Sequence, residues 1–149
     1  MPVVEINDSI EAPPQVVWDF FSDLRRIPEY TPSEVPYISD GPIQQGTVYR
    51  ERGQFLGSTS ESEWLITEFD PPRRQEHFSN ESTVRVTVTL VLEPVGNGTR
   101  LSQTTDFQVM PRFRPLGWLL EKLVVQRMIS KQLREMVQGA KQMIEAERA

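Results

Sequence analysis

The first and middle parts of the chain alternate apolar and polar positions, as strands with one buried face do. The alternation covers residues 3–11 and ends at Ala12-Pro13-Pro14. It recurs between residues 35 and 110 in short runs, separated by turn sequences such as Asp70-Pro71-Pro72 and Gly96-Asn97-Gly98. The pattern predicts six strands in this middle part, over residues 35–39, 47–56, 60–69, 74–79, 84–92 and 99–110.

Other segments favour helices. Pro14 suits a first helical turn, and the apolar residues that follow it as far as Leu24 keep helical spacing. Residues 25–30 can add a short second turn. The segment from Pro115 to about Glu147 is rich in Leu, Gln, Glu, Lys and Arg and predicts a helix of roughly 50 Å at about 1.5 Å per residue. Because this exceeds the width of a domain of this size, the rest of the chain should lie along the helix or around it.

The two halves of this long helix differ. From Ile129 onward its apolar residues form one stripe, which indicates packing against a single surface, with the short N-terminal helices as expected partners. From Leu116 to Val125 apolar residues point in most directions, so this half is either buried by its own domain or lines a ligand site. Glu121 and Lys122 interrupt the run well short of the ~20 apolar residues of a membrane span. We therefore expect no stable membrane insertion.

The order of elements is strand, two helices, six strands and long helix. Strands linked by hairpins form antiparallel sheets with one face exposed to solvent. We therefore predict an α+β helix-grip fold, in which an antiparallel sheet of about seven strands curls around the long C-terminal helix. A length of 149 residues fits a single domain over residues 1–149.

Composition narrows the classes of function. Sixteen Lys and Arg against 21 Asp and Glu give a net charge of −5, which argues against a nucleic-acid partner. The chain has no Cys and one His, so disulfides and Cys nucleophiles are excluded, and we expect neither a metal nor another cofactor. No secretory signal is visible at the start, which favours a cytoplasmic location. We expect a monomer or homodimer.

A series of short motifs runs through nearly the whole chain in a consistent order. They are Ile10-Glu11-Ala12-Pro13-Pro14 followed by Val17-Trp18-Asp19-Phe20-Phe21-Ser22-Asp23, then Gly46-Thr47-Val48-Tyr49-Arg50, Trp64-Leu65-Ile66-Thr67-Glu68-Phe69-Asp70-Pro71-Pro72-Arg73-Arg74, Gly98-Thr99-Arg100-Leu101 and Phe113-Arg114-Pro115-Leu116-Gly117. This series resembles the START-like or birch-pollen-allergen-like superfamily, often labelled SRPBCC. Within it, the series is most similar to the polyketide cyclase/dehydrase and lipid-transport family. The resemblance implies an apolar cavity between the sheet and the long helix.

A ligand in such a cavity would contact the apolar strand faces and the first half of the long helix. From the alternation we expect the contacts to come from Tyr30, Tyr49, Phe55, His77, Val86, Val88, Gln103, Phe107, Phe113, Leu116 and Leu120. Val86, Val88 and Phe107 are more typical of a packed core than of ligand contacts. Gln103 is more informative, because an amide on an otherwise apolar strand face needs a hydrogen-bond partner.

Three functions fit these features, and we favour the first. It is non-enzymatic binding or carriage of an apolar small molecule of lipid, polyketide or isoprenoid type. The second is a polyketide cyclase or dehydratase in which His77 is the general acid-base and Tyr49 or Glu63 orients substrate or carries protons. The competing interpretation of His77 is a strand-end histidine without a catalytic role. Glu51 and Glu63 lie on neighbouring predicted strands, and whether they form a carboxylate pair depends on a register that the sequence does not give.

The third function is an interaction protein, as in the coenzyme Q-binding and ribosome-associated branches of the superfamily. The resemblance permits this function without favouring it. The net charge of −5 counts against a ribosomal partner, because RNA is itself negatively charged.

Substitution of Leu120 by Arg tests the binding hypothesis. A guanidinium group in an apolar pocket carries a large desolvation cost. We expect Leu120→Arg to abolish binding of an apolar, environment-sensitive dye and His77→Ala to leave it nearly intact, as measured by fluorescence titration. An enzyme would instead lose turnover in His77→Ala while its binding was preserved.

Overall fold

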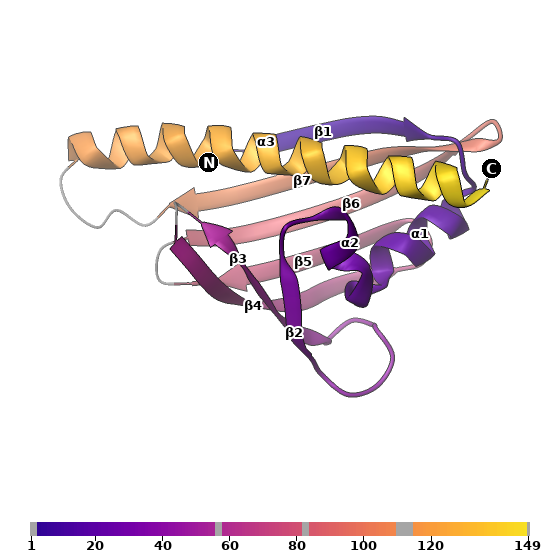
Figure 1. Ribbon diagram of the computed structural model, residues 1–149, viewed down its shortest axis with the longest axis horizontal. Coiled ribbons are helices and arrows are strands. Elements are labelled where there is room, and N and C mark those ends of the chain that lie inside the picture. Colours follow the sequence, from indigo (N-terminus) through magenta and orange to yellow (C-terminus); the bar gives the residue numbers. More distant parts are fainter. Residues whose placement is uncertain (1–2, 56–57, 82–83, 110–114, 149) are drawn as a thin grey trace.

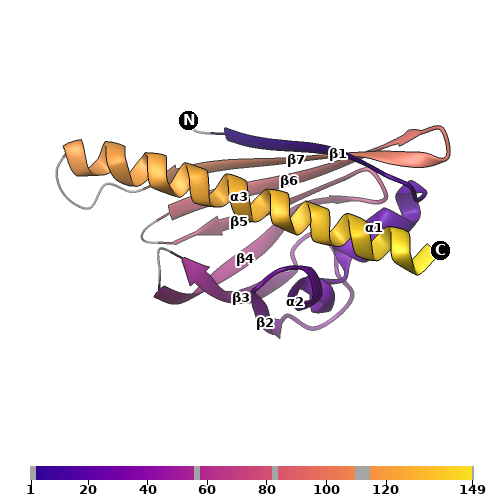
Figure 2. The same ribbon diagram turned by 45° about the horizontal axis from the view of Figure 1, so that its top comes forward.

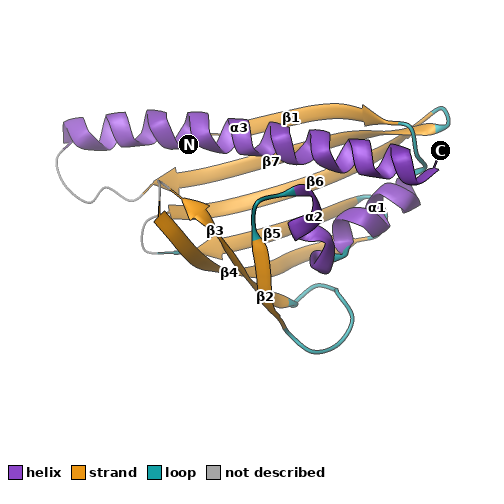
Figure 3. Cartoon of the chain, viewed as in Figure 1, coloured by secondary structure: helices purple, strands orange, loops and turns teal. Residues whose placement is uncertain are grey.

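The computed structural model describes the backbone of residues 3–55, 58–81, 84–109 and 115–148 and most of their side chains. Figure 3 shows its helices and strands. In chain order the described elements are β1 (Val3–Ile10), α1 (Pro14–Ser22), the short 3-10 turn η1 (Leu24–Arg26), α2 (Ile27–Tyr30), β2 (Glu34–Ile38), β3 (Val48–Phe55), β4 (Ser58–Asp70), β5 (Arg74–Asn80), β6 (Val84–Val95), β7 (Gly98–Val109) and α3 (Pro115–Arg148).

The strands form one seven-stranded sheet in the order β1-β7-β6-β5-β4-β3-β2. Every neighbouring pair in it is antiparallel. The long helix α3 lies along one face of this sheet, and α1 and α2 lie near its C-terminal end (Figures 1 and 2). The structure confirms the predicted helix-grip fold.

The ends of some elements differ from the prediction. The strand β4 begins at Ser58, inside the stretch Gly57-Ser58-Thr59 that the sequence predicts as a turn. The strand β6 continues beyond Leu92 to Val95, because the ladder with β7 is paired as far as Val95 and Gly98. The hairpin is therefore longer than the apolar alternation alone indicates.

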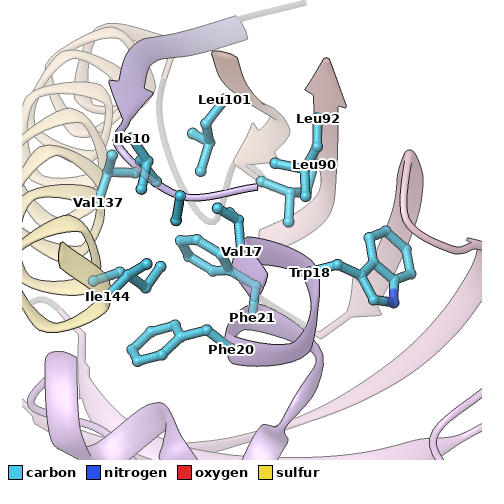
Figure 4. Packing of buried hydrophobic residues seen from close by; sticks show 12 residues of the cluster. Ile10, Val17, Trp18, Phe20, Phe21, Leu90, Leu92, Leu101, Val137 and Ile144 are labelled. Atoms are coloured by element: carbon cyan, nitrogen blue, oxygen red, sulfur yellow. The ribbon is translucent and has the colours of Figure 1, made fainter. Parts of the chain in front are cut away.

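The helix α1 closes one end of the molecule with aromatic and aliphatic side chains. These pack between the second half of α3 and the strands β6 and β7, as the predicted helix packing requires (Figure 4). The buried cluster includes Ile10, Ala12, Val17, Trp18, Phe20, Phe21, Leu90, Leu92, Leu101, Val137, Ala140 and Ile144.

The second half of α3 packs through the predicted stripe. Leu133, Val137 and Ile144 are buried, whereas Lys131 is exposed. Lys141 differs from the prediction, which placed it on the solvent side. It is half-buried, and its Nζ lies 3.3 Å from Oδ1 of Asp8 on β1. This ion pair joins the helix to the edge strand.

In the first half of α3 the structure describes Leu123 and Val124, which are 54% and 55% exposed. These side chains are therefore not part of the core. The helices in the described part of the chain include none that could span a bilayer, since none is apolar over a sufficient length.

Truncation of Leu101 is expected to destabilise the fold. Its side chain is fully buried beneath α1, so Leu101→Ala should lower the free energy of unfolding by about 3 kcal/mol. The control is Leu65→Ala, at a leucine that is 39% exposed, which should cost less than about 1 kcal/mol. Urea unfolding monitored by circular dichroism measures both, and equal losses would contradict the assignment of the core.

Candidate functional site

The face of the sheet turned toward α3, called the inner face below, has an apolar floor and polar groups beside it. Along β6 the floor is made by Val84, Val86 and Val88, which alternate with residues of the opposite face. The register places His77 of β5 and Thr105 of β7 on either side of Val88. Side chains from three neighbouring strands therefore meet there.

The apolar core does not cover this part of the inner face completely. Val84, Val86, Val88 and His77 are only half-buried, although β5 and β6 lie inside the sheet and not at its edge. We call these four residues the half-buried strip. Within the described part of the chain, Val88 belongs to none of the apolar clusters that form the core.

A chain of side-chain hydrogen bonds runs from the strip to α1. The Tyr49 hydroxyl of β3 lies 2.7 Å from Nδ1 of His77, and Nε2 of His77 lies 2.7 Å from Oε1 of Gln75. Nε2 of Gln75 donates to Oγ of Ser22, the last residue of α1, at 3.2 Å. The Tyr49 ring also stacks on Trp64, with centroids 6.3 Å apart.

The direction of this chain fixes the tautomer of His77. Gln75 uses its amide group to donate to Ser22, so its oxygen faces the imidazole and accepts a hydrogen bond from Nε2. Nδ1 is then the acceptor, and the Tyr49 hydroxyl donates to it. The lone pairs of the Tyr49 oxygen are left to accept a further hydrogen bond.

Burial keeps both members of the Tyr49–His77 pair uncharged. Desolvation lowers the pKa of His77 from 6.5 to about 4. Desolvation also raises the pKa of the Tyr49 hydroxyl well above its usual value, and the nearby carboxyl of Glu51 adds to the effect. At neutral pH the imidazole is a neutral group with both nitrogens occupied, which makes it a weak general base.

Three further polar atoms near the strip are buried without a hydrogen-bond partner in the described part of the structure. They are Oγ of Ser79 on β5, and Oε1 of Gln103 and Oγ1 of Thr105 on β7. These side chains alternate with residues of the outer face and therefore share the inner face with His77. A buried polar group without a partner costs about 1–3 kcal/mol, so such groups often mark functional positions.

A family model described as polyketide cyclase/dehydrase and lipid transport matches residues 1–145. The chain belongs to this family. Members of this family bind apolar ligands and include polyketide cyclases.

Individual proteins similar to this family member agree with the assignment. The uncharacterised Mycobacterium tuberculosis protein Rv1546 is 27% identical over 120 residues, covering 78% of this chain and 84% of that protein. The crystal structure of TTHA0849 from Thermus thermophilus is 26% identical, with a TM-score of 0.79 and coverage of 99% of this chain and 100% of that chain. A START superfamily protein from Mycobacterium smegmatis is 11% identical, with a TM-score of 0.75 and coverage of 97% of each chain. These structures confirm the START-like fold that the sequence resembles, and the family model confirms the predicted polyketide cyclase/dehydrase and lipid-transport family.

Three other residues that the sequence suggested for the site, Tyr30, Val86 and Phe107, pack in or against the apolar core. Tyr30 of α2 is half-buried against Phe20 and Phe21. Val86 lies beside Phe107 in the ladder, and Phe107 is fully buried in a core cluster with Val4 and Leu133. Phe113 and the side chains of Phe55, Leu116 and Leu120 lie outside the described residues, so their roles stay predictions.

The structure separates Glu63 from the other candidates. The β3–β4 register pairs Glu63 with Arg50 and Glu51 with Ser62, so the two carboxylates point to opposite faces of the sheet. Glu63 is exposed, and its carboxylate lies 3.6 Å from the Arg50 guanidinium. Glu51 and Glu63 therefore do not form a carboxylate pair, and Glu63 lies on the wrong face of the sheet to serve His77.

The sequence analysis missed Gln75, Ser79 and Thr105 as candidates. Gln75 and Ser79 stand two positions before and after His77, so the alternation that placed the histidine also placed them on its face. The short strand β5 has no run of alternating apolar residues, so its polar side chains gave no sign of which face is buried. Only the register shows that they lie beside the half-buried strip of this family member.

A separate surface groove of about 700 Å³ lies between β1 and α3. Its lining mixes acidic Glu5 and Glu135 with basic Arg127, Lys131 and Arg134, and it does not include the half-buried strip. Among the residues that the structure describes, no His, Asp and Glu side chains are grouped closely enough to hold a metal ion.

The stability of the protein should fall as the pH drops below about 6.5. Above that pH, His77 is neutral in both the folded and the unfolded chain. Because folding lowers the pKa of His77 from 6.5 to about 4, the unfolded chain binds the extra proton in that window. Stability is then fully present above pH 6.5 and declines toward pH 4. We expect the half-buried imidazole to contribute on the order of 2 kcal/mol to this loss.

The comparison variant is His77→Gln, which keeps hydrogen-bonding capacity but does not titrate. Urea midpoints measured from pH 7.5 to 4 should show a steeper loss for the native chain than for this variant. The difference isolates His77 from carboxyl groups that titrate in the same range. Parallel curves would show that the histidine is not held neutral by the fold.

Proposed function

We propose that the protein binds and carries an apolar small molecule, of lipid, polyketide or isoprenoid type, between the inner face of the sheet and α3. The observation that carries this proposal is the half-buried strip. Aliphatic side chains in the middle of a sheet are normally covered when a helix packs over them. Here Val84, Val86 and Val88 keep accessible surface, which an apolar ligand would remove from water at a gain of roughly 25 cal/mol per Å².

The polar groups around the strip support a ligand with some polar character. The Tyr49 oxygen can accept a hydrogen bond, and Gln103 and Thr105 have unused hydrogen-bonding capacity close by. Ligand sites are typically apolar with a few polar groups that fix orientation. Membership in a family described by polyketide cyclisation and lipid transport agrees with this composition.

Binding is supported better than catalysis. A cyclase or dehydratase would need His77 to remove a proton, but Nδ1 is already engaged by Tyr49 and Nε2 by Gln75. The pKa of about 4 further weakens the imidazole as a base at neutral pH. The pair instead suits a fixed, neutral hydrogen-bonding group in the wall of a ligand site.

Native mass spectrometry of freshly purified protein, followed by solvent extraction, tests the proposal. We expect a discrete apolar adduct on the native chain. Val88→Phe should fill the strip and reduce the adduct severalfold, because the added ring occupies the space of the ligand. Thr89→Phe is the matched control, since Thr89 is the next residue of β6 and faces the opposite side of the sheet.

Two outcomes would contradict the proposal. One is an adduct that both variants reduce equally, which would place the ligand elsewhere. The other is a clean mass for the native protein together with no binding of an apolar dye. The second result would favour the interaction-protein hypothesis.

A further inference from the structure

Glu51 is an acidic residue on the ligand side of the sheet. It stands two positions after Tyr49 on β3 and shares its face, while Arg50 and Arg52 point to the outer face and are exposed. The Glu51 side chain is half-buried. Burial raises the pKa of its carboxyl group, as expected for a carboxyl removed from water.

The loop after α2 brings the Ser33 hydroxyl to β3 beside Gly53, two positions after Glu51. The Thr31 hydroxyl donates to the Ile27 carbonyl at 2.8 Å and accepts from the Ser33 amide at 3.1 Å, which fixes the start of the loop. Oγ of Ser33 then lies only 2.8 Å from the point where a Cβ on Gly53 would stand. Glycine at this position leaves room for Ser33, whose hydroxyl stabilises the charged form of Glu51 and so opposes the effect of burial on the pKa.

Two phenols complete the surroundings of Glu51. Tyr49 shares the inner face of β3 with Glu51. Burial raises the pKa of both Tyr30 and Tyr49, and the charge of Glu51 adds to the effect. Tyr49 donates a hydrogen bond to His77, whereas the structure gives Tyr30 no such partner among the described residues. We call Glu51, Tyr49, Tyr30 and Ser33 the polar group. Glu51 and Tyr49 share one face of β3, Ser33 approaches that strand at Gly53, and Tyr49 is hydrogen-bonded to His77 of the half-buried strip.

The positive charges near β3 are directed away from this group. Arg50 pairs with Glu61 and Glu63, and Arg52 pairs with Glu34 and Glu61, all on the outer face. Within the described ranges, no Lys or Arg lies at ion-pair distance from Glu51. The polar group therefore offers acceptors and hydroxyls without a cation.

We propose that Glu51, with Tyr30 and Ser33, binds the polar end of the ligand by accepting a hydrogen bond from a hydroxyl group, and that the ligand is uncharged. The same carboxyl group selects against ligands that end in a carboxylate or another anion. This inference rests on the proposed function, because it concerns the chemistry of a ligand at the same site.

The selection follows from the chemistry of a carboxyl group. A carboxyl oxygen accepts a hydrogen bond from a hydroxyl whether the group is protonated or ionised. An anionic ligand would either meet a like charge at short range in a poorly solvated site or require Glu51 to be protonated. Both routes weaken anion binding, and no arginine among the described residues compensates for them.

Three probes of the same apolar body test the proposal at pH 7.5. Naphthalene has no polar end, 2-naphthol has a neutral hydroxyl, and 2-naphthoate has a carboxylate. Fluorescence titration should give the tightest binding for 2-naphthol, with at least a tenfold weaker Kd for 2-naphthoate. Naphthalene should bind with intermediate strength, since it neither donates to Glu51 nor repels it.

Glu51→Gln is the variant that isolates the carboxyl group. The amide keeps the size and an acceptor oxygen but removes the negative charge, so the preference for 2-naphthol over 2-naphthoate should fall severalfold. Glu63→Gln removes one negative charge from the outer face of the same sheet and should leave the preference unchanged. The comparison separates a local effect of Glu51 from the net charge of the chain.

The outcomes distinguish failure of this inference from failure of the proposed function. If no probe binds, the ligand site itself is contradicted, and the inference falls with it. If naphthalene binds but 2-naphthoate binds as well as 2-naphthol, only the role of Glu51 is overturned. An unchanged preference in a folded Glu51→Gln variant would also overturn it. If Glu51→Gln does not fold, the native chain still allows the inference to be overturned, because 2-naphthoate that binds as tightly as 2-naphthol contradicts it without any variant.

Discussion

The packing of α1 between α3 and the sheet is the interaction on which the rest of the structure depends. Val17, Phe20 and Phe21 of α1 fill the space between the second half of α3 and the strands β6 and β7. The ion pair between Asp8 and Lys141 joins α3 to the edge strand β1. A second, smaller cluster of Val4, Phe107 and Leu133 joins α3 to the same sheet. Val88 lies outside the described clusters and stays half-buried.

Within that strip, the cost of burying polar groups limits what the side chains can do. An imidazole surrounded by protein stays neutral, and its two nitrogens are satisfied by Tyr49 and Gln75 because unsatisfied buried groups would cost more. The same arrangement that stabilises the histidine removes it from proton transfer. With both nitrogens engaged and a lowered pKa, His77 is poorly placed to act as a general base at neutral pH.

The sequence predicted the fold well because its evidence is local. Alternation identified the buried faces of β6, with Val86 and Val88, and of β7, with Gln103. Helical spacing identified the apolar stripe of α3 that packs on the rest of the protein. Contacts between distant segments were not accessible in this way. The prediction that Glu63 assists His77 was wrong because it depends on the β3–β4 register. This register pairs Glu51 with Ser62 and Glu63 with Arg50, and neither strand's own sequence shows it. The contact of Gln75 with Ser22 and the approach of Ser33 to β3 depend on how helices and loops pack over the sheet.

The end of α1 has a consequence beyond its packing. Ser22 is both the last residue of that helix and the terminal acceptor of the chain that passes through Gln75 and His77 to Tyr49. The orientation of each group in the series is determined by the one before it, so the helix sets which way the phenolic proton points. A rotation of α1 that released Gln75 would allow its amide to turn and donate to Nε2 of His77, so that Nδ1 carried the proton and donated to the Tyr49 oxygen. The phenolic proton of Tyr49 would then be free to point away from the imidazole. The position of α1 and the direction of the Tyr49 hydroxyl are in this way linked through Gln75 and His77.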